Sequence, residues 1–199
     1  MKTLQIVVSA VTLVASVTLS APADELVYRV GGTRGLAPSH DILVFTDKIE
    51  VMAYGAEGKF PIYEIGRLWP VSKSKHHVVL AGIYGSRREK VDQWHVEPFM
   101  LAKAWRGKTT GTAKLFSYLP LNGGPTLVGA DELSVVHSVT PTVGIGVEGT
   151  FFKANPSPLE VQWGPTIRLK RGDTSVSARY LSFGRGAESF RLTVSRSLP

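Results

Sequence analysis

The chain has 199 residues, 43% of them hydrophobic, and its 23 Lys and Arg residues outnumber its 16 Asp and Glu residues. It contains no cysteine, which excludes a small secreted domain held together by disulfides. The positive residues are scattered singly or in pairs such as Arg87-Arg88 and Lys170-Arg171. A nucleic-acid binder usually clusters them on one helix or loop, so no nucleic-acid partner is expected.

The first 23 residues have the features of a cleaved signal peptide. Lys2 gives a positive start, residues 4–19 are uncharged and largely apolar, and Ala21-Pro22-Ala23 has the small-x-small pattern of a cleavage site. The apolar stretch is short against the roughly 20 residues that a spanning helix needs. We predict cleavage after Ala23, leaving one domain over 24–199, in which 24–40 form an N-terminal extension or a short plug segment.

The mature sequence reads as a series of β-strands and shows no convincing helical periodicity. The clearest strand covers 159–169. There Leu159, Val161, Trp163, Ile167 and Leu169 share one face, and Glu160, Gln162, Thr166 and Arg168 share the other. Residues 143–151 and 190–195 alternate in the same way. Less regular candidate strands cover 41–54, 60–71, 76–86, 93–106, 109–121, 126–139 and 174–184.

The links between these strands are short and rich in turn-forming residues, as in 55–58, 122–125 and 171–173. Short links make consecutive strands antiparallel neighbours, because a parallel crossover needs a dozen or more residues. The resulting meander has two unpaired edges, and closing the sheet removes both. The sequence therefore predicts an all-β fold, an up-and-down antiparallel β-barrel of about eight to ten strands.

Two kinds of barrel fit this pattern, and they differ in where the apolar face points. A soluble lipocalin-like barrel holds a hydrophobic ligand inside, whereas a membrane barrel turns its apolar face to lipid. Candidate strands of about 10 to 14 residues favour the membrane version. We expect a charge network in the lumen formed by Glu148, Glu160, Arg168 and Arg191. We expect an aromatic girdle at the membrane interfaces that includes Trp69, Trp94, Trp105 and Tyr118.

In this strand pattern, residues 40–199 resemble the small outer-membrane β-barrel proteins of Gram-negative bacteria. The chain departs from them at its end, because such barrels commonly finish in an aromatic residue and this one finishes in Pro199. The resemblance implies an outer-membrane location, with the lipid bilayer as partner and a structural or narrow-pore role. Anionic lipid or polysaccharide is a further possible partner for the positive charge. The alternative is a soluble periplasmic or secreted lipocalin-like barrel that binds a hydrophobic ligand.

Neither an enzyme nor a cofactor is expected. His76 and His77 are adjacent and would face opposite sides of a strand, and the other histidines show no ligand spacing, so no metal site is predicted. His137 and Ser138 would diverge for the same reason, which leaves a lipid-modifying hydrolase of the outer membrane as a minor alternative. The sequence leaves the transported solute, the openness of the lumen and the oligomeric state undetermined.

Overall fold

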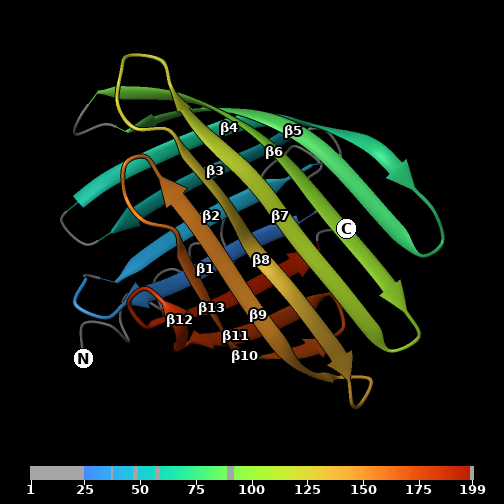
Figure 1. The fold of residues 1–199 in the computed structure, drawn as a ribbon. Coiled ribbons are helices and arrows are strands. Elements are labelled where there is room, and N and C mark those ends of the chain that lie inside the picture. Colours follow the sequence, from blue (N-terminus) through green and yellow to red (C-terminus); the bar gives the residue numbers. More distant parts are fainter. Residues whose placement is uncertain (1–24, 37, 47–48, 57–58, 89–91, 198–199) are drawn as a thin grey trace.

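The computed structural model describes residues 25–36, 38–46, 49–56, 59–88 and 92–197. The predicted signal peptide, residues 1–23, lies outside the described residues. Within the described ranges, no helix is long and apolar enough to cross a membrane. The strands wrap into one antiparallel barrel (Figure 1).

The barrel wall is a single sheet whose strands follow one another around the ring. The strands are β1 (Glu25–Thr33), β2 (Ser39–Phe45), β3 (Ile49–Ala56), β4 (Lys59–Lys73), β5 (His77–Arg88), β6 (Gln93–Arg106), β7 (Thr109–Pro120), β8 (Leu127–Ser138), β9 (Val143–Ala154), β10 (Glu160–Arg171), β11 (Thr174–Leu181), β12 (Phe183–Arg185) and β13 (Ser189–Ser197).

Pairing between the first and last strands closes the ring. β13 pairs with β11 on one side and with β1 on the other, in a register that sets Glu25 opposite Ser197. The short strand β12 pairs with β10 at Val161 to Trp163, beyond the stretch of β10 that pairs with β11. The structure confirms the up-and-down antiparallel barrel, which is closed by twelve strands with β12 as an extra short pairing.

The count exceeds the predicted eight to ten because of two hairpins near the N-terminus. Residues 25–33, assigned from the sequence to an extension or plug, are instead β1 of the wall. Gly32 fits there because a Cβ would lie 2.6 Å from the Phe190 ring on β13. The candidate strand 41–54 is divided into β2 and β3, and the Thr46 hydroxyl accepts a hydrogen bond from the Ile49 amide at 2.9 Å where the two strands meet.

The apolar face of the wall points outward. On β10, Val161, Trp163, Ile167 and Leu169 are 41%, 49%, 44% and 48% exposed, whereas Thr166 between them is 6% exposed. Other strands follow the same rule, with exposed residues that include Ile65, Ile83, Met100, Leu115, Val128, Val135, Ile145, Val147 and Leu192. This orientation is the reverse of the one that the soluble lipocalin-like alternative requires.

A small aromatic core lies inside the barrel against β4 to β6. It consists of Leu68, Tyr84 and Phe99, with Phe45, Leu80, Leu101 and Phe116 packed against it. The rings of Tyr84 and Phe99 stack with their centroids 4.3 Å apart. Tyr84 lies flat against the neighbouring strand because that strand has a glycine there: a Cβ on Gly66 would come within 1.7 Å of its ring.

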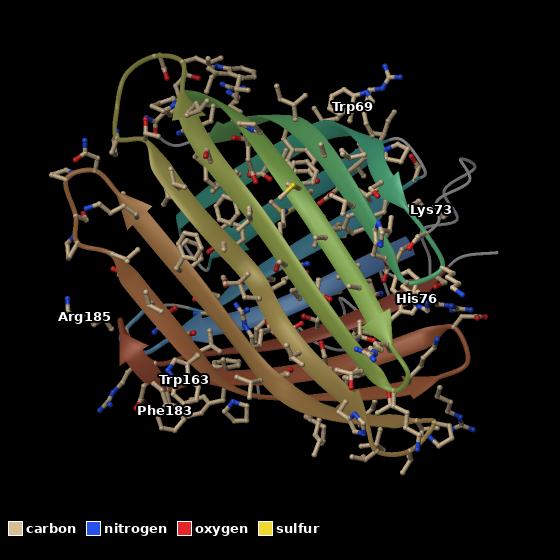
Figure 2. All side chains as sticks on the ribbon, turned by 45° about the vertical axis from the view of Figure 1, so that its right-hand side comes forward. Trp69, Lys73, His76, Trp163, Phe183 and Arg185 are labelled. Carbon is tan, nitrogen blue, oxygen red and sulfur yellow. The ribbon has the colours of Figure 1, made fainter. Side chains whose placement is uncertain are left out.

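The barrel has two rims. The terminal rim is the end where β1 begins and β13 ends, and it carries the connections 74–76, 107–108, 139–142 and 172–173. The distal rim is the opposite end, with the connections 121–126, 155–159 and 186–188. Figure 2 shows Trp69, Lys73 and His76 toward the terminal rim and Trp163, Phe183 and Arg185 toward the distal rim.

Candidate functional site

A β-bulge in β8 turns two consecutive carboxylates into the lumen. The register of β8 gains one residue against β9 between Ala130 and Leu133, and against β7 between Asp131 and Ser134. Glu132 takes a φ of 58° at this point, a conformation that non-glycine residues rarely adopt. In a regular strand adjacent side chains face opposite sides, so the bulge is what allows Asp131 and Glu132 to share the interior.

Two arginines face these carboxylates from the neighbouring wall. Arg191 on β13 donates to Asp131 at 2.7 Å and to Glu148 at 3.0 Å. Arg179 on β11 donates to Asp131 at 2.9 Å and also to Glu148. All four side chains are less than one-fifth exposed. Charges this buried are stable only when they are paired, so each arginine depends on the two carboxylates it shares.

A third arginine extends the ion pairs across the lumen. Arg29, near the middle of β1, donates to Glu132 near the middle of β8 and lies 3.3 Å from Asp41 on β2. Going around the ring from β1 to β8 by the shorter path passes β13, β11, β10 and β9. The contact between Arg29 and Glu132 therefore joins nearly opposite walls of the barrel.

We call the following set the cross-lumen network: Arg29, Asp41, Asp131, Glu132, Glu148, Arg179 and Arg191.

A second polar group, the glutamate–tyrosine cluster, lies on the opposite side of the interior. It consists of Glu50, Glu64, Glu97, Tyr84 and Tyr118. The Tyr84 hydroxyl donates to Glu50, and the Tyr118 hydroxyl donates to Glu64 at 2.9 Å. Glu97 is 1% exposed. Because three glutamates gather there, this wall of the lumen is acidic.

Lys114 on β7 brings a positive charge to the aromatic core. Its ammonium lies 5.4 Å from the centre of the Tyr84 ring and 5.2 Å from that of Phe99, within the range of a cation–π contact. The two polar groups and the aromatic core therefore all project into the interior of the barrel.

The structure brings together two of the four residues predicted for the lumen charge network. Glu148 and Arg191 form an ion pair. Glu160 is exposed at the distal end of β10, and Arg168 is half-buried on the inner face. Neither of these two makes an ion pair with another described residue. Both residues alternate with the outward-facing apolar residues of β10 and so belong to its inner face. The bulge of β8, however, directs the acidic side chains toward arginines on β11 and β13.

Sequence reasoning missed Arg29, Asp41, Asp131, Glu132 and Arg179. The sequence places Arg29 in the predicted N-terminal extension, outside the predicted wall. A signal was present for the bulge: the adjacent acids Asp131-Glu132 interrupt a β-rich segment, and a regular strand would turn one of them toward the apolar face.

The four aromatic residues predicted for the girdle occupy different environments. Trp69 and Trp94 are 41% and 49% exposed on the outer face, with the guanidinium groups of Arg67 and Arg87 over their rings at 6.0 Å and 5.3 Å. Trp105 donates its indole N–H to the Lys75 carbonyl at 2.8 Å, at the terminal rim.

Tyr118 differs from the other three, because it points into the lumen toward Glu64. A stacked aromatic pair lies toward the distal rim, where Trp163 and Phe183 have ring centroids 4.6 Å apart (Figure 2).

Solved outer-membrane proteins have the same architecture. The KdgM porin, solved in complex with disordered oligogalacturonate, superimposes with a TM-score of 0.68 and 10% sequence identity, covering 88% of this chain and 99% of that one. The NanC porin gives 0.61 and 10% identity, with 87% and 100% covered. Omp33 of Acinetobacter baumannii gives 0.54 and 11% identity, with 87% and 97% covered.

The chain has the fold of a bacterial outer-membrane porin. The resemblance predicted from the strand pattern is thereby confirmed at the level of the fold. The sequence matches no protein-family model and no curated protein.

Within this porin fold, the chemistry of the interior is that of paired charges. Among the described residues, no three His, Cys, Asp or Glu side chains are placed to hold a metal ion. The cross-lumen network brings nearly opposite walls of the barrel into contact through Arg29 and Glu132.

Proposed function

We propose that the chain is a non-enzymatic protein of the bacterial outer membrane that forms a narrow pore, constricted by the cross-lumen network. The outward apolar face and the porin fold support insertion in the bilayer, which is then the protein's first partner. Export through a signal peptide cleaved after Ala23 belongs to the same proposal.

The contact between Arg29 and Glu132 is the observation that carries the proposed constriction. A barrel of twelve strands is wider than the roughly eight-stranded barrels that side chains just fill, so a passage is expected unless side chains bridge it. Here a bulge and three arginines bridge it, at the middle of β1 and β8.

The three arginines of the cross-lumen network are neutralised by carboxylates. The KdgM porin was solved with oligogalacturonate, an acidic ligand. In the present chain each of Arg29, Arg179 and Arg191 is paired to at least two carboxylates, and the opposite wall carries three more glutamates. This charge balance gives no support for a preference for acidic sugars.

Single-channel conductance in planar bilayers tests the proposal. We compare the wild-type protein with Glu132→Gly, which removes the residue that reaches Arg29 and suits the left-handed backbone at this position. Arg29 keeps Asp41 as a partner, so no charge is left isolated. We expect a small wild-type conductance and a several-fold larger one in the variant.

The matched control is Glu160→Gly, which removes a glutamate from the inner face of β10, at its exposed distal end. Its conductance should equal that of the wild type. If none of the three proteins conducts although all are inserted, the pore is ruled out and a purely structural barrel remains.

A further inference from the structure

An apolar groove lies on the outer wall of the barrel near the terminal rim. Its volume is about 490 Å³, within the range of small-ligand sites. Its lining residues include Ala102, Ala104, Gly111, Ala113, Val135 and Val147.

The strand register explains why the wall is hollow at this point. Ala104 on β6 faces Gly111 on β7, and Ala102 faces Ala113, so the floor consists of four small residues on two adjacent strands. Val135 on β8 pairs with Gly111 and with Val147 on β9, and these larger side chains form one bank.

The same register places polar and positively charged residues at the rimward end of the groove. Arg106 and Thr109 lie two residues closer to the terminal rim than Ala104 and Gly111 do. His137 pairs with Thr109. The Thr109 hydroxyl and His137 Nδ1 are 3.0 Å apart. Lys108 follows in the turn between β6 and β7. Arg106 and Lys108 are both exposed, and neither forms an ion pair with another described residue.

We infer that this groove binds one anionic phospholipid, with an acyl chain along the small residues and the phosphate at Arg106 and Lys108. The inference rests on the proposed membrane location. An acyl chain fits an apolar groove with a floor of small residues and a bank of aliphatic side chains. Two positive side chains that form no ion pair with another described residue, close to the terminal rim, complement a phosphate group.

A second copy of the chain fits the groove less well. In a two-fold symmetric contact the same patch meets itself, so Arg106 and Lys108 would approach their own equivalents. Like charges brought together in this way oppose the contact, whereas an anionic headgroup neutralises them.

The test is native mass spectrometry of the full mature protein in detergent, with phosphatidylglycerol or phosphatidylcholine of identical acyl chains added. We expect the wild type to retain one phosphatidylglycerol in preference to phosphatidylcholine. Arg106→Gln with Lys108→Gln should lose that preference by about thirtyfold, since each of the two cationic residues near a lipid surface contributes about 1 kcal/mol and 1.4 kcal/mol corresponds to a factor of ten.

Two further variants separate the parts of the site. Lys170→Gln with Arg171→Gln removes the same charge from the terminal rim at β10, away from the groove, and should leave retention unchanged. Gly111→Val fills the groove and should weaken retention of both lipids. A Cβ at Gly111 has room, since its nearest neighbour is the Ser134 carbonyl at 3.8 Å.

Equal retention of the two lipids by the wild type would overturn the inference, as would an equal loss in the β10 control or a dimer in place of a lipid adduct. Insertion into phosphatidylcholine vesicles, read by heat-modifiable migration on a gel, is measured on the same samples. A protein that inserts without selecting phosphatidylglycerol refutes only the lipid site, whereas one that does not insert refutes the proposed membrane function.

Discussion

The most connected residues of this barrel are the arginines inside it. Arg191 pairs with Asp131 and Glu148, Arg179 shares both of those carboxylates, and Arg29 reaches Glu132 across the lumen. Each of these arginines therefore has more than one carboxylate partner. Loss of a whole guanidinium leaves buried carboxylates with fewer positive neighbours.

Arg191→Gln should therefore destabilise the barrel. We expect a loss of about 3 kcal/mol in the free energy of unfolding, the lower end for breaking a buried pair, because Arg179 still faces both carboxylates. Urea unfolding followed by tryptophan fluorescence measures it. Arg168→Gln is the matched control, because Arg168 is inward-facing and half-buried without an ion pair to another described residue. Equal losses in the two variants would contradict a stabilising role for the network.

At the scale of the strand, the bulge of β8 is the feature that positions the network. Removing Glu132 should leave Val128 and Val135 on the outer face, because the deletion takes out the extra residue and restores regular alternation. The deletion variant should still form a heat-modifiable barrel. Deleting Ile145 from the regular strand β9 should abolish it, because a one-residue shift there turns part of the strand inside out. Failure of both deletions, or survival of both, would contradict this account of the bulge.

Strand alternation accounts for how much of the fold the sequence predicted. The regular period-two pattern of 159–169 gave β10 and its two faces, because each outward residue is apolar and each inward one is polar or small. The turn at Thr46 contains no glycine or proline, so β2 and β3 read as one strand. The network was found only in part, because a bulge breaks the alternation from which its members were inferred.

On the scale of the whole molecule, the barrel reverses the arrangement of a water-soluble protein, with its apolar side chains outside and its polar ones inside. Its wall shows exposed tryptophan, isoleucine, leucine and valine, and its interior holds carboxylates, guanidinium groups and tyrosines. An exposed apolar surface of this extent is a liability in water, and in a bilayer it is the stable arrangement. The twelve-strand closure leaves no free edge, so the backbone groups of the wall are paired within the sheet.

Spin labels on single cysteines test this account most directly, and the chain has no native cysteine to interfere. We compare the variants Ile167→Cys, Val135→Cys and Lys108→Cys. All three positions are exposed, so burial within the protein cannot account for a difference in access between their labels. In vesicles, the labels at 167 and 135 should relax with oxygen dissolved in lipid, and the label at 108 with a water-soluble nickel reagent. Access of the nickel reagent to positions 167 and 135 equal to that at 108 would contradict a lipid-facing wall.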